Sequence, residues 1–151
     1  MIASSIRAEI VAEKISYVRN MVEALRSRPL SSYEDFSADT RNVAAAESYL
    51  RRALEALFDI GRHILAKAFS MALAEYKQIA EALTKKGVVS KEEGRILREM
   101  AGYRNRMVHF YHEIGDQELY GICRDSLGDI ERISETFGKW LQEHPEKVTR
   151  L

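Results

Sequence analysis

The residues best suited to chemistry gather in one stretch of the chain, from Gly102 to Asp116. Its polar and titratable side chains are Arg104, Asn105, Arg106, His109, Tyr111, His112 and Glu113. An arginine and a histidine this close together can act on one phosphate if the backbone brings them to the same place. The same stretch also fits an ordinary charged helix end, in which Met107, Val108 and Phe110 pack inward.

The spacing within this stretch decides which side chains share a face of a helix. Asn105 and His109 are four residues apart and Arg104 and Tyr111 are seven apart, so each pair lies on one face. Arg104 and His109 are five apart, about 140° around a straight helix. One helix therefore aims both at one phosphate only with help from the long arginine side chain, a distorted helix end or a second copy of the chain.

Metal and nucleotide sites of the common kinds are not indicated. Helical bundles often bind iron through Glu-x-x-His pairs, which this sequence lacks, and His109 with His112 would supply only two ligands. The chain also has no Gly-x-x-x-x-Gly-Lys loop and no glycine-rich turn for a dinucleotide. We expect no metal and no cofactor. Cys123 is interpreted as a small buried thiol and His63 as a histidine in solvent or at the core edge.

Composition limits the class of protein and its partners. With 151 residues, 46% hydrophobic and 30% charged, the chain is expected to form a single domain over residues 1–151. Equal numbers of cationic and acidic residues give a formal net charge of +0, so any RNA site must be a local patch. The longest uncharged stretch, Ala68–Ala74, is too short to cross a membrane. No secretory signal is readable, and a single cysteine fits the reducing cytoplasm.

Apolar residues recur at steps of three and four along most of the chain, which predicts helices. Ser90 and Glu93 form a capping box and Gly87 suits a helix C-terminus. No stretch predicts a strand. We therefore predict an all-α fold, an antiparallel bundle of four long helices and one short helix. The expected helices cover residues 5–28, a long central one ending near 69, 76–86, one from 90 to about 107, and a continuous one from 116 to just before Pro145.

The motif in this stretch resembles a known family. Residues Arg104 to Tyr111 fit the R-x4-H-x-Y motif of the HepT-like toxins in the HEPN superfamily of helical ribonucleases. Gly102-Tyr103 precedes the motif and an acidic loop around Asp116 follows it. The segment AESYLRRALEALFDIGRHILA also resembles the long second helix of that family. The resemblance extends from the first expected helix to Trp140.

The resemblance implies a metal-independent endoribonuclease that works as a homodimer, with motifs from two protomers facing each other. His109 would then move protons between the ribose 2′-hydroxyl and the leaving oxygen, since its ordinary pKa is about 6.5. Arg104 would stabilise the phosphate as it gains charge, and Asn105 would orient the phosphate or His109. Arg106 either contacts RNA or faces solvent, and Phe110 either stacks on a base or packs in an interface.

The family also implies a partner. A minimal nucleotidyltransferase, the antitoxin, transfers AMP to the motif tyrosine, here Tyr111, and so blocks the site. Two hypotheses follow: a toxin ribonuclease of a toxin–antitoxin pair, or a non-nucleolytic helical partner of the nucleotidyltransferase that presents Tyr111 or helps bind its substrate. The presence of both Arg104 and His109 favours the ribonuclease, because an acceptor needs only the tyrosine.

Overall fold

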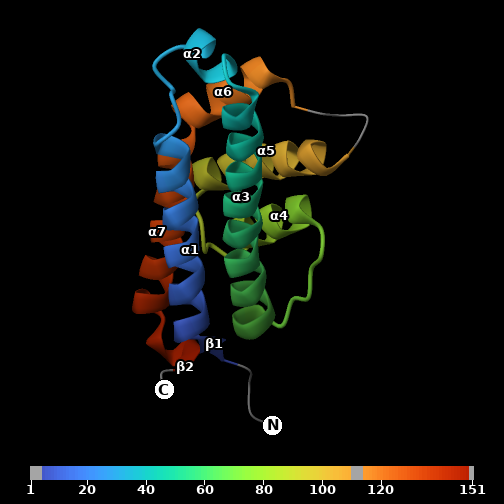
Figure 1. The fold of residues 1–151 in the computed structure, drawn as a ribbon. Coiled ribbons are helices and arrows are strands. Elements are labelled where there is room, and N and C mark those ends of the chain that lie inside the picture. Colours follow the sequence, from blue (N-terminus) through green and yellow to red (C-terminus); the bar gives the residue numbers. More distant parts are fainter. Residues whose placement is uncertain (1–4, 110–113, 150–151) are drawn as a thin grey trace.

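The computed structural model describes residues 5–109 and 114–149, and these are mostly helical (Figure 1). The long helices are α1 (Ala8–Arg26), α3 (Thr40–Phe69), α5 (Lys91–Val108) and α7 (Leu127–Glu143), and the shorter α-helices are α2 (Tyr33–Ser37), α4 (Tyr76–Lys85) and α6 (Asp116–Asp125). The predicted all-α fold with four long helices is therefore confirmed. Within the described residues, three shorter α-helices accompany them instead of one.

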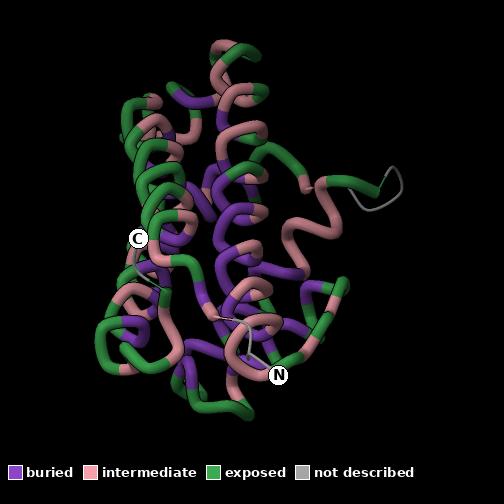
Figure 2. Tube along the Cα trace, turned by 90° about the horizontal axis from the view of Figure 1, so that it is seen from below, coloured by how far each residue is buried: buried purple, intermediate pink, exposed green. Residues whose placement is uncertain are grey.

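The helices form two sets that meet at α3. Helices α1, α3 and α7 run along one axis, with α1 antiparallel to the other two, whereas α4 and α5 lie across that axis (Figure 1). The buried positions, purple in Figure 2, lie on the inner sides of the helices, and α3 contributes many of them, including Leu54, Leu57, Phe58 and Ile64. Helix α3 packs against α1, α4, α5, α6 and α7. Polar residues on its surface therefore lie within reach of several neighbouring helices.

Local sequence signals fix the hairpin of α4 and α5. Gly87 has φ +74°, a conformation that glycine adopts without strain, and it lets the chain turn back after α4. The Ser90 hydroxyl accepts a hydrogen bond from the Glu93 amide at 3.1 Å, and the Glu93 carboxylate accepts one from the Ser90 amide at 3.0 Å, so the predicted capping box is present. A Cβ on Gly94 would overlap the Thr84 side chain, so a glycine there lets α5 approach α4 closely.

The first expected helix begins later in the structure than predicted. Residues Ile6–Arg7 form a two-residue strand, β1, that pairs in parallel with β2, Val148–Thr149, after the short 3-10 helix Pro145–Lys147. The prediction that the chain has no strand is wrong at this point. A two-residue strand has too little alternation to be recognised in a sequence, and this pairing joins the two ends of the described chain.

The expected continuous last helix is interrupted. Ser126 ends α6 and also precedes α7, and its amide donates to the Ile122 carbonyl. Serine and the following Gly128 both have lower helix propensity than alanine or leucine, which makes this a favourable place for the break. The apolar spacing continues across the break, so periodicity alone did not reveal it. Helix α6 packs against α2 and α3, and α7 packs against α1.

Within residues 5–109 and 114–149, none of the helices combines the length and the apolar composition needed to cross a bilayer.

The capping box predicts a measurable contribution to stability. Ser90→Ala removes the acceptor for the Glu93 amide and should lower the free energy of unfolding by about 1 kcal/mol in urea titrations. Ser126→Ala is the matched control, because Ser126 also precedes a helix but its side chain makes no capping hydrogen bond. The control should change stability by less than about 0.5 kcal/mol. Equal effects of both substitutions would contradict a specific role for the box.

Candidate active site

The C-terminal part of α5 carries four of the residues that the motif singled out. Arg104, Asn105 and Arg106 lie in its last turns, and all three are partly buried. His109 follows as the C-cap residue, with extended backbone angles (φ −102°, ψ 124°), and is exposed. The helix therefore ends directly before His109, which frees the imidazole from the regular helical direction.

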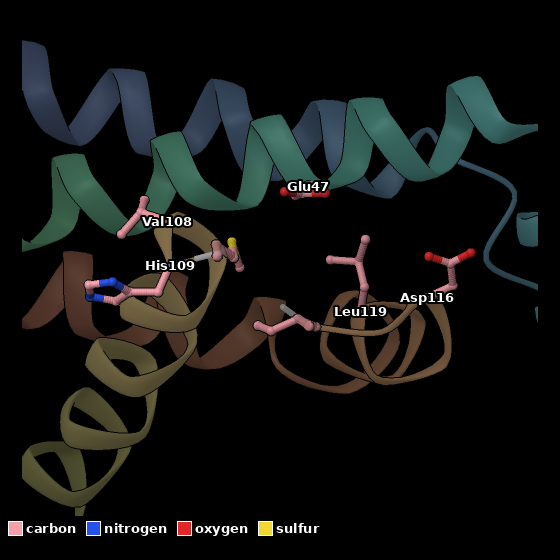
Figure 3. Close-up of a pocket in the computed structure, with 7 residues that line it drawn as sticks. Glu47, Val108, His109, Asp116 and Leu119 are labelled. Carbon is pink, nitrogen blue, oxygen red and sulfur yellow. The ribbon is translucent and has the colours of Figure 1, made fainter. Parts of the chain in front are cut away.

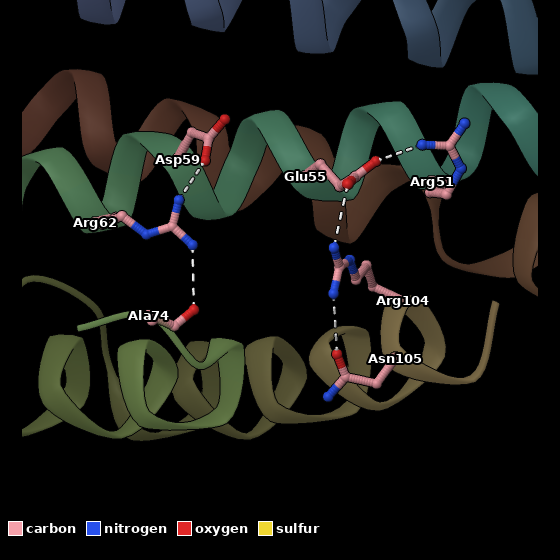
Figure 4. Close-up of polar contacts among 7 residues, drawn as sticks. All are labelled: Arg51, Glu55, Asp59, Arg62, Ala74, Arg104 and Asn105. Carbon is pink, nitrogen blue, oxygen red and sulfur yellow. Dashed lines mark hydrogen bonds and ion pairs between the residues drawn. The ribbon is translucent and has the colours of Figure 1, made fainter. Parts of the chain in front are cut away.

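The guanidinium of Arg104 is held from three sides. It donates to the Glu55 carboxylate on α3 at 3.3 Å and to the Asn105 side-chain oxygen at 3.4 Å (Figure 4). Its central carbon lies 4.4 Å from the centre of the Tyr76 ring at the start of α4. The Nε–H is buried and has no hydrogen-bond partner among the described residues. Arg104 thus joins α3, α4 and α5 at one point while 26% of its side chain stays exposed.

Glu55 and Tyr76 were not identified as site residues from the sequence. Glu55 pairs with Arg51 one turn earlier at 2.7 Å and with Arg104, so one carboxylate serves two cations. Its signal in the sequence is an acidic residue between buried Leu54 and Ala56, with an arginine four residues before it. Burial raises the pKa of the Tyr76 phenol.

A second ionic cluster continues along the same side of α3. Asp59 pairs with Arg62 at 2.9 Å and with Lys14 of α1 at 3.7 Å. Arg62 also donates to the carbonyl oxygens of Leu73 and Ala74, which ties the segment before α4 to α3 (Figure 4). These contacts fix the start of α4, and with it the ring on which Arg104 lies.

His109 borders a separate cavity of about 270 Å³. Its described lining residues are Glu47, Met107, Val108, His109, Ile114, Asp116 and Leu119. Figure 3 shows the His109 ring and Asp116 at opposite ends of this cavity. Two carboxylates and no lysine or arginine belong to that lining, so the cavity itself does not attract a phosphate.

Arg106 of α5 pairs with Glu118 of α6. Both of its terminal nitrogens donate to the Glu118 carboxylate at 2.7 Å, a two-pronged pair that joins α5 to α6. This pair raises the pKa of Arg106 and lowers that of Glu118. Of the two roles left open for Arg106, the structure shows exposure to solvent, since 41% of its side chain is exposed while it pairs with Glu118, and contact with RNA stays a prediction.

The structure brings Arg104 and Asn105 together and leaves His109 apart from them. No hydrogen bond within residues 5–109 and 114–149 joins Arg104 to His109, as the angle of about 140° between them on one helix leads us to expect. The predicted acceptor Tyr111, together with Phe110, His112 and Glu113, lies outside the described residues.

The two side chains that we interpreted as structural have structural surroundings. His63 is half-buried, and its Nε2 accepts a hydrogen bond from the Arg7 amide at 3.1 Å. Burial, followed by the charges of Lys67 and Lys14, lowers the pKa of His63. Cys123 is buried, and burial raises the pKa of its thiol to about 12. In the part of the chain that the structure describes, no group of three or more His, Cys, Asp or Glu residues is arranged to hold a metal ion.

Solved structures with the same fold include toxin–antitoxin proteins. The tri-AMPylated Shewanella oneidensis HEPN toxin, solved in complex with an MNT antitoxin, matches with a TM-score of 0.79 and 20% identity, over 86% of this chain and 97% of that chain. A toxin–antitoxin structure with AMP-PNP matches with a TM-score of 0.75 and 19% identity, over 85% and 97%. YutE of Bacillus subtilis, a cytosolic protein of unknown function, matches with 0.77 and 16%, over 92% and 93%.

Sequence comparison identifies the family directly. A search of curated proteins gives no significant match. The family profile described as Ribonuclease HepT-like matches residues 8–137, which include every long helix at least in part and the whole R-x4-H-x-Y motif. The resemblance noted in the sequence is thereby confirmed, and the chain belongs to the HepT-like ribonuclease family.

Proposed function

We propose that this chain is the toxin of a toxin–antitoxin pair and a metal-independent endoribonuclease, with residues 1–151 forming one helical domain that acts in the cytoplasm. The observation that carries the proposal is the oriented, partly exposed guanidinium of Arg104 near the end of α5, five residues before the exposed imidazole of His109, which directly follows the helix. An oriented cation and a free imidazole are the groups that cleavage of a phosphodiester by its own 2′-hydroxyl requires.

In the proposed reaction, His109 takes the proton of the ribose 2′-hydroxyl, and the resulting oxygen attacks the neighbouring phosphorus. The bond from phosphorus to the 5′-oxygen breaks, and that oxygen receives a proton from an imidazolium. The products are a 2′,3′-cyclic phosphate and a 5′-hydroxyl. Arg104 stabilises the extra charge on the phosphorane, since its planar fork of N–H donors matches phosphate oxygens.

The geometry favours supporting roles for Asn105 and Arg106 and the participation of a second copy of the chain. Asn105 contacts the Arg104 guanidinium and so helps to orient it. Arg106, paired with Glu118, holds the end of α5 against α6. Arg104 turns toward Glu55 on α3 whereas His109 is exposed, so a homodimer that sets the motif of one protomer against that of its partner supplies both groups to one phosphate.

Membership of the family, together with the two similar solved toxin–antitoxin structures, supports a proposal of regulation by a partner. We propose that a cognate nucleotidyltransferase antitoxin transfers AMP to Tyr111. Tyr111 is two residues after His109 in the sequence, so a bulky anionic adduct on Tyr111 would exclude an RNA phosphate by its size and by its charge.

A second candidate function is a non-nucleolytic partner of the nucleotidyltransferase. The observation in its favour is that Glu55 already pairs with Arg104, which makes this arginine a plausible structural link between α3 and α5. Under that hypothesis Arg104→Ala lowers stability and no RNA cleavage exists to be lost.

Cleavage without metal is the central prediction. The wild-type protein should cleave RNA in EDTA and leave a 2′,3′-cyclic phosphate, and it should leave deoxy substrates intact. His109→Ala should reduce the rate by about 10²- to 10⁴-fold, since it removes the acid–base group. Arg104→Ala should lose activity to a similar extent. Rates are measured on a labelled oligonucleotide, with the melting temperature of each variant recorded.

His144→Ala is the matched control for this prediction. It removes an imidazole that stacks on Trp140 at the end of α7, away from α5, and should leave the cleavage rate unchanged. A His109→Ala protein that cleaves at the wild-type rate, or wild-type cleavage abolished by EDTA, would refute the mechanism and favour the acceptor hypothesis.

Modification of Tyr111 is the second prediction. With the cognate nucleotidyltransferase, ATP and magnesium, intact-mass spectrometry should show AMP added to the wild-type protein and none on Tyr111→Phe. Tyr17→Phe is the control, because Tyr17 is an exposed phenol on α1 and should not affect the reaction. Equal addition to wild type and Tyr111→Phe would remove Tyr111 from this role.

Dimerisation through the end of α5 is the third prediction. Val108 is 44% exposed and continues the half-buried apolar residues Tyr103 and Met107, which a second copy would cover. Sedimentation velocity at tens of micromolar should show a dimer for wild type and a monomer for Val108→Glu. Tyr17→Glu, at an equally exposed apolar position on α1, should remain dimeric. A monomeric wild-type protein would count against the proposed site.

A further inference from the structure

A concentration of positive charge lies in a groove between α4 and α5, away from Arg104. This groove, here called the basic groove, has a volume of about 940 Å³. Its lining residues are Lys77, Glu81, Thr84, Lys85, Lys91, Gly94, Arg95, Arg98 and Glu99. It thus holds five cations and two carboxylates. Because the formal net charge of the chain is +0, the remaining residues carry three more carboxylates than cations.

The cations of the basic groove are free to bind an anion. Lys77, Lys85 and Lys91 are exposed and make no ion pair within the described residues. Arg95 and Arg98 face Glu99 and Glu81 only at 3.6 and 3.7 Å, in exposed pairs that contribute little to stability. A phosphate group can therefore replace these carboxylates at small cost. The Thr84 hydroxyl on the groove floor already donates to the Ala80 carbonyl.

The basic groove leads along α5 to the proposed catalytic end. A line along one side of α5 from Lys91 reaches the end of the helix at Val108, about 26 Å further along the axis, and His109 follows directly. Arg98 and Asn105 lie within about 40° of that line. A Cβ on Gly102, between them, would meet no atom within 4 Å, so this stretch of the helix surface is open.

The cavity at His109 cannot by itself attract the substrate, because the charged groups of its described lining are the carboxylates of Glu47 and Asp116. We infer that the basic groove binds the phosphate backbone of the RNA strand whose scissile bond lies at His109. This inference rests on the proposed function for the identity of the strand. What the inference adds is the place where most of the RNA affinity arises, which is the α4–α5 face at a distance from the reacting groups.

The test compares two triple variants in a His109→Ala background, which prevents cleavage. The groove variant carries Lys85→Gln, Arg95→Gln and Arg98→Gln. The control variant carries Arg19→Gln, Arg41→Gln and Lys139→Gln, which remove the same charge from exposed sites on α1, α3 and α7. Binding of a fluorescent single-stranded RNA is measured by anisotropy from low to high salt, and thermal unfolding checks the fold of each protein.

The groove variant should lose about 100-fold in affinity at about 0.1 M salt, and the slope of log K against log salt should become shallower by about 2, since each contact to a single strand contributes about 0.7. The control variant should bind within about threefold of its parent. In cleavage-competent protein the same groove substitutions should act on KM rather than on kcat. The double variant Lys77→Gln, Lys91→Gln should also weaken RNA binding, and it breaks no ion pair among the described residues.

Several outcomes overturn the inference. Unchanged RNA binding by the groove variant does so, as does an equal loss in the control variant. Unchanged RNA binding together with lost nucleotidyltransferase binding or a shift from dimer to monomer assigns the groove to a protein interface instead. If the groove variant loses RNA binding while the wild-type protein never cleaves RNA in EDTA, the basic groove stands and the proposed nuclease function fails.

Discussion

The contact of Arg104 with Glu55 and Tyr76 is the constraint on which the site depends. It lies where the axial set of helices, through α3, meets the crosswise pair α4 and α5 (Figure 1). Tyr76 in turn stacks on buried Phe58 of α3, with ring centres 4.5 Å apart. The orientation of α5 against α3 is thus coupled to the position of one guanidinium. His109 and the basic groove both belong to α5, so their positions depend on the same contact.

Glu55 also determines what happens when a phosphate approaches Arg104. A partly buried carboxylate that loses its only cation is left partly desolvated and unpaired, which is unfavourable. Glu55 has a second cation, Arg51, at 2.7 Å, so it remains paired when Arg104 turns to the substrate. In the proposed reaction the exchange of carboxylate for phosphate therefore leaves no unpaired charge on α3. The long 3.3 Å distance from Arg104 to Glu55 suits a contact that orients the guanidinium and then gives way.

Local signals in the sequence predicted the helices well, and contacts distant in sequence were missed. The period of apolar residues predicted α3 to its last residue, Phe69, and the Ser90 capping box predicted the start of α5. These features depend on neighbours within four residues. The partner of Arg104 is 49 residues away, and although Glu55 stands between two apolar residues with an arginine four residues before it, that local signal does not indicate Arg104 as its partner. The break at Ser126 was missed because α6 and α7 keep one apolar spacing and both pack on α3, while α6 also contacts α2 and α7 also contacts α1.

The proposed binding of RNA requires this neutral chain to separate its charges, and the crossing of its helices provides such a separation. Polar faces of the axial helices carry mixed clusters, such as Asp59 with Lys14 and Arg62, in which cations are neutralised locally. The crosswise pair α4 and α5 packs on α3, and its basic groove holds five cations against the two carboxylates of Glu81 and Glu99. Cations placed there keep their charge toward solvent. In the proposed function, the attraction of RNA is therefore separated from the chemistry at the end of α5, where the carboxylates of Glu47 and Asp116 line the cavity at His109 and Arg104 is the cation proposed to meet the phosphate.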